Sequence, residues 1–290
     1  MHERILKSGL IAINIAAIIF GTAVLYGKLN VSPFWIVAAR SVFACVALYC
    51  IGFFKKDLNL AKGFSKRRPL IITGLLLGTH WLTFFGSVQL AGVAIATLAF
   101  ATFPLFTVFA ESIKLRKLPS ILQVVAAVSI VVAVSLLINL DASGAQIQGA
   151  IAGLVSAATF AVFGIKSKQL TKELTPITVS FMQNLTVAIS TSCFLPLSHP
   201  LPTSSTDWMC LVLLGVVTTA IMHQLYLFAL TKLSATVCSG FIALEPIYAI
   251  VLAAIFFKEP ITFWVVVSGF LIIGASLVLL RSESENINMD

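Results

Sequence analysis

The chain has 290 residues, of which 59% are hydrophobic and only 10% are charged. Soluble domains carry roughly 25% charged residues, so this composition excludes an ordinary water-soluble protein. The net charge is +8, but no basic stripe, RNA-binding signature or zinc-ligand spacing accompanies it, which argues against a nucleic-acid partner.

The apolar residues fall into ten segments, each long enough to cross a bilayer, which takes about 20 residues as a helix. In chain order we expect helices at Ser8–Tyr26, Pro33–Phe54, Pro69–Leu90, Gly92–Ser112, Pro119–Leu140, Ile147–Ile165, Thr175–Leu197, Asp207–Leu230, Leu233–Phe257 and Pro260–Leu280. The first segment lacks a small-x-small cleavage site, so we interpret it as a retained helix and not as a signal peptide. The short connections leave no room for an inserted soluble domain.

The basic residues of the connections indicate the orientation of the chain. If the N-terminus is cytoplasmic, sixteen Lys and Arg fall on the cytoplasmic side, and only Lys28 and Lys258 fall outside. Arg40 lies within a segment. Because cytoplasmic loops carry an excess of Lys and Arg, we expect both termini in the cytoplasm and the chain in a bacterial inner or plasma membrane.

An internal repeat relates the two halves of the chain, residues 1–142 and 143–290. The matched positions are Gly9, Phe20 and Lys28 with Gly149, Phe160 and Lys168, Ser32–Pro33 with Thr175–Pro176, Gly74 with Gly215, Pro104 with Pro246, and Lys117–Leu118–Pro119 with Lys258–Glu259–Pro260. Each half has five segments, an odd number, so the second half must enter the membrane upside down. The sequence therefore predicts an all-α membrane protein of ten helices in two inverted five-helix repeats, an arrangement that suits secondary transporters.

Several stretches resemble EamA-type members of the drug/metabolite transporter superfamily. They are Tyr226–Thr236, Leu244–Ile247, Phe257–Pro260, and Pro33 followed by Ala38–Ser41. The resemblance covers essentially the whole chain. It implies a central cavity lined by the first, third, fourth, sixth, eighth and ninth helices, with the second and seventh acting as gates. It also implies transport of small metabolites, amino acids or drugs, most often outward.

The two halves depart from each other at two acidic positions. Glu259 has Leu118 as its counterpart, and Glu245, which precedes Pro246, corresponds to Phe103 before Pro104. We therefore expect the halves to contribute unequally to any site.

Two charged residues, Arg40 and Glu245, lie well inside the predicted helices and away from their ends, where a charge costs about 2.5–3.5 kcal/mol on insertion scales. Glu245 lies near the middle of the ninth helix, where Pro246 removes a backbone hydrogen bond. Its carboxylate could bind a substrate ammonium or carry a proton for antiport; the alternative is a neutral, buried interhelical hydrogen bond. Arg40 either has a structural or gating role or anchors an anionic substrate group. Pro104 and Pro246 are gating or structural candidates.

Histidine, aromatic and amide side chains supply the remaining candidates, and simple packing is the alternative for each. A histidine can titrate near neutral pH, and aromatic faces can hold cations. The substrate-binding candidates are His80, Trp81, Phe100, His223, Gln224, Tyr226, Asn14 and Thr159, and Gln183 is expected to make interhelical hydrogen bonds.

These features predict a secondary transporter that exports amino acids or similar amphiphiles, with an uptake carrier or exchanger as the alternative. An intramembrane enzyme is a remote alternative, because the sequence has no H-E-x-x-H site, aspartate-rich pair or activated nucleophile. We expect no cofactor and no metal. The partners would be the bilayer, a small-molecule substrate and possible coupling protons, and a monomer would suffice for function.

Overall fold

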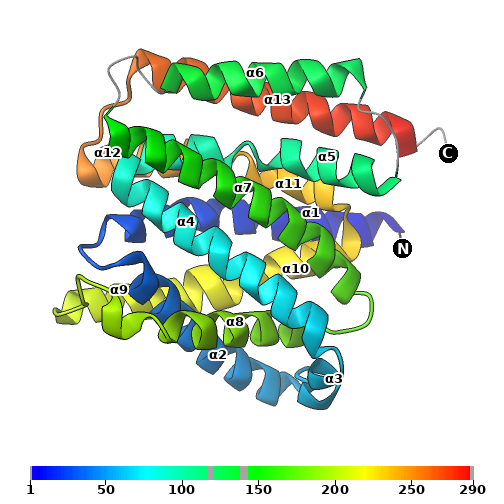
Figure 1. Cartoon of the computed structure of the whole chain (residues 1–290). Coiled ribbons are helices and arrows are strands. Elements are labelled where there is room, and N and C mark those ends of the chain that lie inside the picture. Colours follow the sequence, from blue (N-terminus) through cyan, green and yellow to red (C-terminus); the bar gives the residue numbers. More distant parts are fainter. Residues whose placement is uncertain (1, 116–119, 138–142, 288–290) are drawn as a thin grey trace.

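The computed structural model describes residues 2–115, 120–137 and 143–287. Within these ranges all of the regular secondary structure is helical. The elements, drawn in Figure 1, are α1 (His2–Ala23), η1 (Val24–Lys28), α2 (Pro33–Lys55), α3 (Leu60–Ser65), α4 (Arg67–Phe100), α5 (Phe103–Leu115), α6 (Ile121–Leu137), α7 (Gly144–Leu170), α8 (Pro176–Ser192), η2 (Leu195–Leu197), α9 (Ser205–Gly215), η3 (Val216–Ile221), α10 (Met222–Lys232), α11 (Ala235–Ile242), α12 (Glu245–Phe257) and α13 (Phe263–Ile287).

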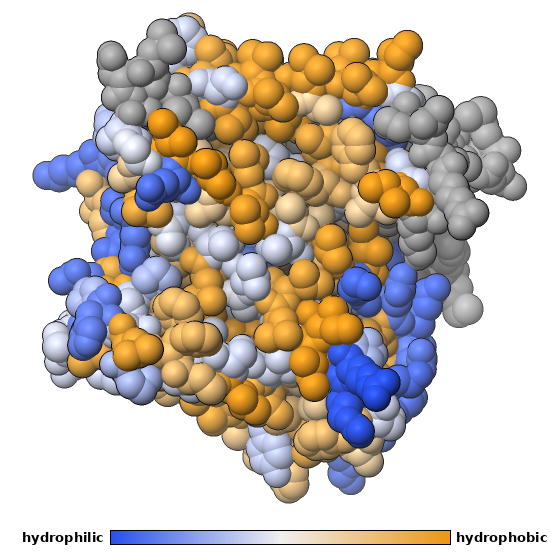
Figure 2. Space-filling model, in the orientation of Figure 1, coloured by the Kyte–Doolittle hydropathy of each residue, from blue (hydrophilic) through white to orange (hydrophobic). Residues whose placement is uncertain are grey.

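Six helical stretches within the described part of the chain are long and apolar enough to cross a membrane. They are Leu6–Lys28, Pro33–Lys55, Arg67–Phe100, Gly144–Leu170, Ser205–Lys232 and Val237–Phe257. Shorter apolar helices occur at Ile121–Leu136 and Phe263–Ala275. Orange, hydrophobic residues cover much of the face in Figure 2, and the blue, hydrophilic ones gather mostly toward its two sides. The chain is therefore an integral membrane protein.

Helix α4 consists of two helices that meet at a kink at Gly92, the position at which the sequence analysis separated the expected helices Pro69–Leu90 and Gly92–Ser112. Gly92 is not helical, at φ 82° and ψ 172°, and the second of the two helices ends at Phe100 and not at Ser112. Glycine has no Cβ and adopts positive φ without strain, so the chain bends there without leaving the bundle. Part of the expected Pro119–Leu140 helix lies outside the described residues.

Two further breaks divide apolar helices just before a proline. Helix α4 ends at Phe100, and α5 begins at Phe103, next to Pro104. In the same way α11 ends at Ile242, and α12 begins at Glu245, next to Pro246. A proline cannot donate the helical hydrogen bond, and its ring crowds the preceding turn, which explains both positions. The result is a pair of broken helices whose ends lie inside the bundle.

Matched glycines of the two halves allow matched helix crossings. A Cβ at Gly74 on α4 would lie 2.6 Å from the Cβ of Thr186 on α8, and one at Gly215 on α9 would lie 2.5 Å from the Cβ of Phe43 on α2. Gly9 and Gly149 behave alike: a Cβ there would lie 2.9 Å from the Cβ of Lys232 and 2.5 Å from that of Ala91. Small residues let helix backbones approach closely in membranes. Glycines paired by the repeat thus stand at equivalent contacts between the halves.

Candidate functional site

A small cavity lies among α1, α2, α4 and α12. It is lined by Phe20, Ala23, Arg40, His80, Trp81, Phe84, Phe85, Phe100 and Glu245. None of these residues is more than 5% exposed. The free space inside is about 10 Å³, which suits a single water molecule at most. Because its walls are almost fully buried, the cavity is closed to solvent, and it combines one basic and one acidic side chain with aromatic walls.

Arg40 reaches this cavity from α2 and is held by two other elements. Its Nε donates a 3.0 Å hydrogen bond to Oγ1 of Thr219 in η3. Its guanidinium carbon lies 3.9 Å from the centroid of the Trp81 ring on α4 and 5.4 Å from that of Phe85. The face of an aromatic ring attracts a cation, most strongly where water is excluded. These contacts explain how a charged side chain is tolerated here.

Glu245 is the first residue of α12, directly after the break that follows α11. Its Oε2 is buried and has no hydrogen-bond partner among the residues described. Although Arg40 lines the same cavity, no ion pair within 4.0 Å joins the two side chains in the described structure. Buried polar atoms are nearly always hydrogen-bonded. The carboxylate oxygen is therefore an acceptor suited to a donor group placed in the cavity.

The two histidines differ in their surroundings. His80 lines the cavity, and its Nδ1 lies 2.7 Å from Oγ of Ser156 on α7. His223 on α10 is buried 5.5 Å from the Trp81 ring, centroid to centroid, and within the described structure neither of its ring nitrogens has a hydrogen-bond partner. Tyr226 packs against Phe160, with the ring centroids 5.5 Å apart. His223 and Tyr226 thus form an aromatic layer behind the cavity.

Three of the expected binding residues lie elsewhere. Asn14 is exposed, and its amide donates to the carbonyl of Leu10 in its own helix. Thr159 is half-buried, and its hydroxyl donates to carbonyls of α7. Gln224 lines a separate pocket of about 440 Å³ with residues of α2 and α8. On α1 the buried positions include 13, 16, 17 and 20, which form one helical face. Position 14 falls outside that face and is exposed.

The remaining gating or structural candidates make contacts between helices or stand at breaks. The Nε2 of Gln183 on α8 donates to Oγ1 of Thr73 on α4 at 3.0 Å and to Oγ of Ser167 on α7 at 2.9 Å. Pro104 and Pro246 stand at the two breaks described above. Gln183 thus connects three helices away from the cavity.

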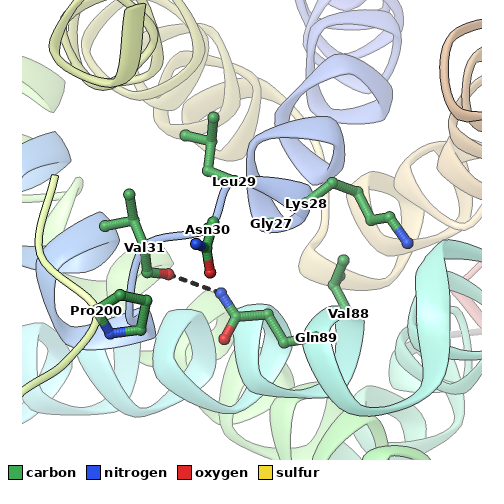
Figure 3. Close-up of a pocket in the computed structure, with 8 residues that line it drawn as sticks. All are labelled: Gly27, Lys28, Leu29, Asn30, Val31, Val88, Gln89 and Pro200. Atoms are coloured by element: carbon green, nitrogen blue, oxygen red, sulfur yellow. Dashed lines mark hydrogen bonds between the residues drawn. The ribbon is translucent and has the colours of Figure 1, made fainter. Parts of the chain in front are cut away.

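One charged contact was not among the site residues expected from the sequence. The carboxylate of Glu259, between α12 and α13, accepts from Nζ of Lys28 at 2.7 Å and from the backbone N–H of Val93 at 3.1 Å. A pocket of about 300 Å³ lies beside Lys28, with Asn30 and Gln89 among its walls (Figure 3). In the sequence, each partner of this contact was marked by the repeat: Lys28 recurs in the second half as Lys168, and Glu259 stands where the first half has Leu118.

The sequence also missed several aromatic walls and the acceptor of Arg40. Phe20, Phe84 and Phe85 line the cavity, and Thr219 accepts from Arg40. Of these, only Phe20 carried a signal, because it recurs in the repeat as Phe160. Nothing in the sequence separates the other two phenylalanines from the 22 in the chain.

An all-helical membrane bundle with a closed cavity inside it, lined by charged and aromatic residues, is an architecture typical of membrane transporters. The chain belongs to the EamA-like transporter family, whose model matches residues 7–139 and again residues 147–281. This places it in the drug/metabolite transporter superfamily and identifies it as a membrane transporter.

Two comparisons with individual proteins agree with the family assignment. The chain is 24% identical over 288 residues to the uncharacterized transporter YxxF of Bacillus subtilis (strain 168), covering 96% of this chain and 92% of that protein. A crystal structure of an 18% identical protein superposes with a TM-score of 0.69, covering 95% of this chain and 97% of the other. The second likeness shows a shared fold.

Proposed function

We propose that this transporter carries small amphiphilic metabolites, such as amino acids, by alternating access, in a ten-helix bundle of two inverted halves, residues 1–142 and 143–290. The observation that carries the proposal is that Arg40 and Glu245 line one closed, aromatic cavity. A substrate ammonium would bind the unpartnered Oε2 of Glu245. A substrate carboxylate would bind the guanidinium of Arg40, whose only hydrogen bond to a described residue uses Nε.

The aromatic walls favour an amphiphile over a simple ion. Phe20, Phe84 and Phe100 supply apolar contact surface, and aromatic faces also attract an ammonium group. The free space of about 10 Å³ is too small for such a molecule, so the cavity must widen for the substrate to bind. A carrier that alternates between two open states passes through a closed state of this kind. Glu245 could also carry a coupling proton in place of a substrate ammonium.

The matched glycine contacts support the two inverted halves. At the α4–α8 crossing the first half supplies the glycine, Gly74, and the second half supplies the helix that it contacts. At the α9–α2 crossing the second half supplies the glycine, Gly215, and the first half supplies the contacted helix. The two family matches fall one on each half. Two arrangements of similar energy follow when each half can adopt the conformation of the other. The proposal places both termini in the cytoplasm of a bacterial cell.

The orientation can be tested by labelling single cysteines with an impermeant maleimide, with the five native cysteines replaced. Cysteines at Lys28 and Lys258 should react from outside the cell, and a cysteine at Lys66 only after the membrane is opened. Reaction of the Lys66 position from outside would contradict the orientation.

The substrate class can be tested by thermal stabilisation of the purified protein against a panel of amino acids, amines and nucleosides. A ligand at 100 times its Kd adds about 2.7 kcal/mol to the stability of the native state. Glu245→Gln should abolish the shift, and Asn14→Ala, on an exposed face of α1, should keep it. A ligand that stabilises Glu245→Gln as well as the wild type would exclude Glu245 from the site.

Direction is a separate question, because it follows from the gradients that drive the carrier. Export is proposed on the family resemblance, with uptake or exchange of a nutrient as the alternative. Whole-cell efflux and uptake of the ligand identified above, measured in the same strain, would separate them. Accumulation dependent on this protein would contradict export.

A further inference from the structure

The turn between α12 and α13 brings one carboxylate to the ends of two other segments. Helix α12 ends at Phe257, and Lys258 follows in the left-handed conformation at φ 54°. Glu259 comes next, with its side chain 20% exposed and that of Lys28 30% exposed. Its Oε1 accepts from Nζ of Lys28 at 2.7 Å, and its Oε2 accepts from the N–H of Val93 at 3.1 Å. We call this pair of contacts the Glu259 bridge.

The bridge contacts α4 where that helix bends. Gly92 has φ 82°, and a Cβ there would lie 3.5 Å from Oε1 of Glu259. Because Gly92 is not helical, the N–H of Val93 stands at the start of a new helical stretch. Such an N–H has no partner within its own helix, and a carboxylate is a favourable acceptor at that position. Glu259 thus fixes the bend as well as pairing with Lys28.

Each of the three joined segments also lines the central cavity. The segment that ends at Lys28 carries Phe20 and Ala23, the stretch that begins at Val93 carries Phe100, and α12 begins with Glu245. The Glu259 bridge therefore joins the three cavity-lining segments at their ends nearest Lys28. The pocket of Figure 3, lined by Gly27, Lys28 and Val88, lies at this end of the bundle.

We propose that Glu259 is the positioning residue that keeps the outer side of the cavity closed, and that breaking the Glu259 bridge opens the cavity toward the pocket of Figure 3. This inference rests on the proposed alternating-access function and adds its outer closure. The repeat provides no equivalent bridge for the inner side of the cavity. The counterpart of Glu259 in the first half is Leu118, an apolar residue outside the described structure. The counterpart of Lys28, Lys168, contacts the carbonyl of Leu233.

The strength of the bridge suits a closure that must open in every cycle. Partly exposed ion pairs contribute little to stability, and a charge-assisted hydrogen bond to a backbone N–H adds a further modest amount. Neither contact is strong enough to hold the outer side closed permanently. Removing one contact should therefore raise the open population several-fold, and removing both should raise it more.

The test uses a reporter cysteine at Ala23 in a chain without its five native cysteines. Ala23 lines the cavity and is 4% exposed, so an impermeant maleimide added outside should reach it only through an open outer side. Lys28→Gln removes the ion pair alone. Glu259→Gln removes the charge but keeps an acceptor for Val93, and Glu259→Ala removes both contacts. Lys258→Gln, at the neighbouring residue, is the matched control.

We expect labelling to accelerate about three- to fivefold in Lys28→Gln and Glu259→Gln and about tenfold in Glu259→Ala, which loses two charge-assisted contacts. The control should label at the wild-type rate. The exchange Lys28→Glu with Glu259→Lys restores the ion pair, but a lysine cannot accept from Val93. Its rate should fall between those of the wild type and Glu259→Ala.

Wild-type labelling rates in both Lys28→Gln and Glu259→Gln would overturn the proposal, and so would a control as fast as Glu259→Ala. If Glu259→Ala fails to insert, the two glutamine variants decide the question. Labelling needs no substrate, so it separates this inference from the proposed function. Ligand binding that depends on Glu245 alongside unchanged labelling would refute the bridge alone, and accelerated labelling without any ligand would support the bridge alone.

Discussion

The Nε of Arg40 donates a 3.0 Å hydrogen bond to Oγ1 of Thr219, and this contact joins α2 to the π-helical turn η3. The hydroxyl of Thr219 in turn donates to the carbonyl of Leu214, five residues earlier, at 2.7 Å. A π-helical turn widens the helix locally and is frequent at functional sites. The widened turn thus places a hydroxyl where it can accept from a buried guanidinium.

Thr219→Val should lower the stability of the protein by about 1–3 kcal/mol, because it removes the acceptor of a buried, charged donor at nearly constant volume. Thr218→Val is the matched control. The hydroxyl of Thr218 donates to the same carbonyl of Leu214 at 2.8 Å but does not accept from Arg40. Thermal unfolding in detergent checks both variants. Equal melting temperatures for the two would contradict a role for the Arg40 contact.

Gly164 and Tyr226 form a second contact that can be tested by compensation. A Cβ at Gly164 on α7 would lie 2.6 Å from the hydroxyl oxygen of Tyr226, and both residues are buried. Gly164→Ala should therefore cost about 1–3 kcal/mol through overpacking. Adding Tyr226→Phe removes the clashing oxygen and should restore most of the melting temperature. If the single variant Gly164→Ala is as stable as the wild type, the side chain of Tyr226 can move aside at little cost in free energy.

The membrane class and the family could be recognised from the sequence, because apolar length, loop charge and the Leu244–Ile247 and Phe257–Pro260 motifs are local features. The residues that line the cavity could be predicted only in part. Glu245, Arg40, His80, Trp81 and Phe100 were expected and line it, since rare polar and aromatic residues in apolar helices attract attention. Asn14 and Thr159 were expected too, but which face of a helix meets the cavity depends on packing between helices.

The Lys28–Glu259 contact shows more clearly what could not be predicted from the sequence. Its partners are 231 residues apart, and the bend at Gly92 that exposes the N–H of Val93 depends on backbone geometry. The repeat marked Lys28 and Glu259 as unusual positions, but it could not bring them together. The packing of the helices in three dimensions brings the two residues together.

The matched glycines predict parallel effects in the two halves. A Cβ at Gly215 would lie 2.8 Å from the backbone oxygen of Arg40, and one at Gly74 would lie 3.0 Å from that of Gln183. Since a backbone cannot move aside cheaply, Gly215→Ala and Gly74→Ala should each lose about 1–3 kcal/mol. Gly86→Ala on α4 is the control, because no atom lies within 4 Å of its added Cβ.

That control should be neutral or more stable by about 0.5–1 kcal/mol, since alanine favours a helix over glycine. Thermal unfolding in one detergent compares all three variants. Loss of stability in Gly86→Ala equal to that in Gly215→Ala would mean that helix crossing is not the cause.

The Lys66–Glu173 ion pair predicts a pH-dependent contact between the α3–α4 connection and the α7–α8 connection. Nζ of Lys66 lies 2.5 Å from Oε2 of Glu173. The hydrogen bond and the charge of Lys66 lower the pKa of the Glu173 carboxyl from its usual value of 4.5. The contribution of the pair is therefore complete above that usual value, and it is lost as the pH falls through the lowered pKa.

Spin labels at Ser65→Cys and Lys172→Cys, two exposed positions beside the pair, would measure this by pulsed electron paramagnetic resonance in the cysteine-free background. The distance distribution should be narrow at neutral pH and broaden when the pH drops well below 4.5. Lys66→Gln should show the broad distribution at every pH, because the carboxylate of Glu173 loses its hydrogen-bonded cation and keeps only the weaker influence of the Lys62 charge. A distribution that broadens with acid equally in Lys66→Gln and the wild type would assign the change to other groups at that end of the bundle.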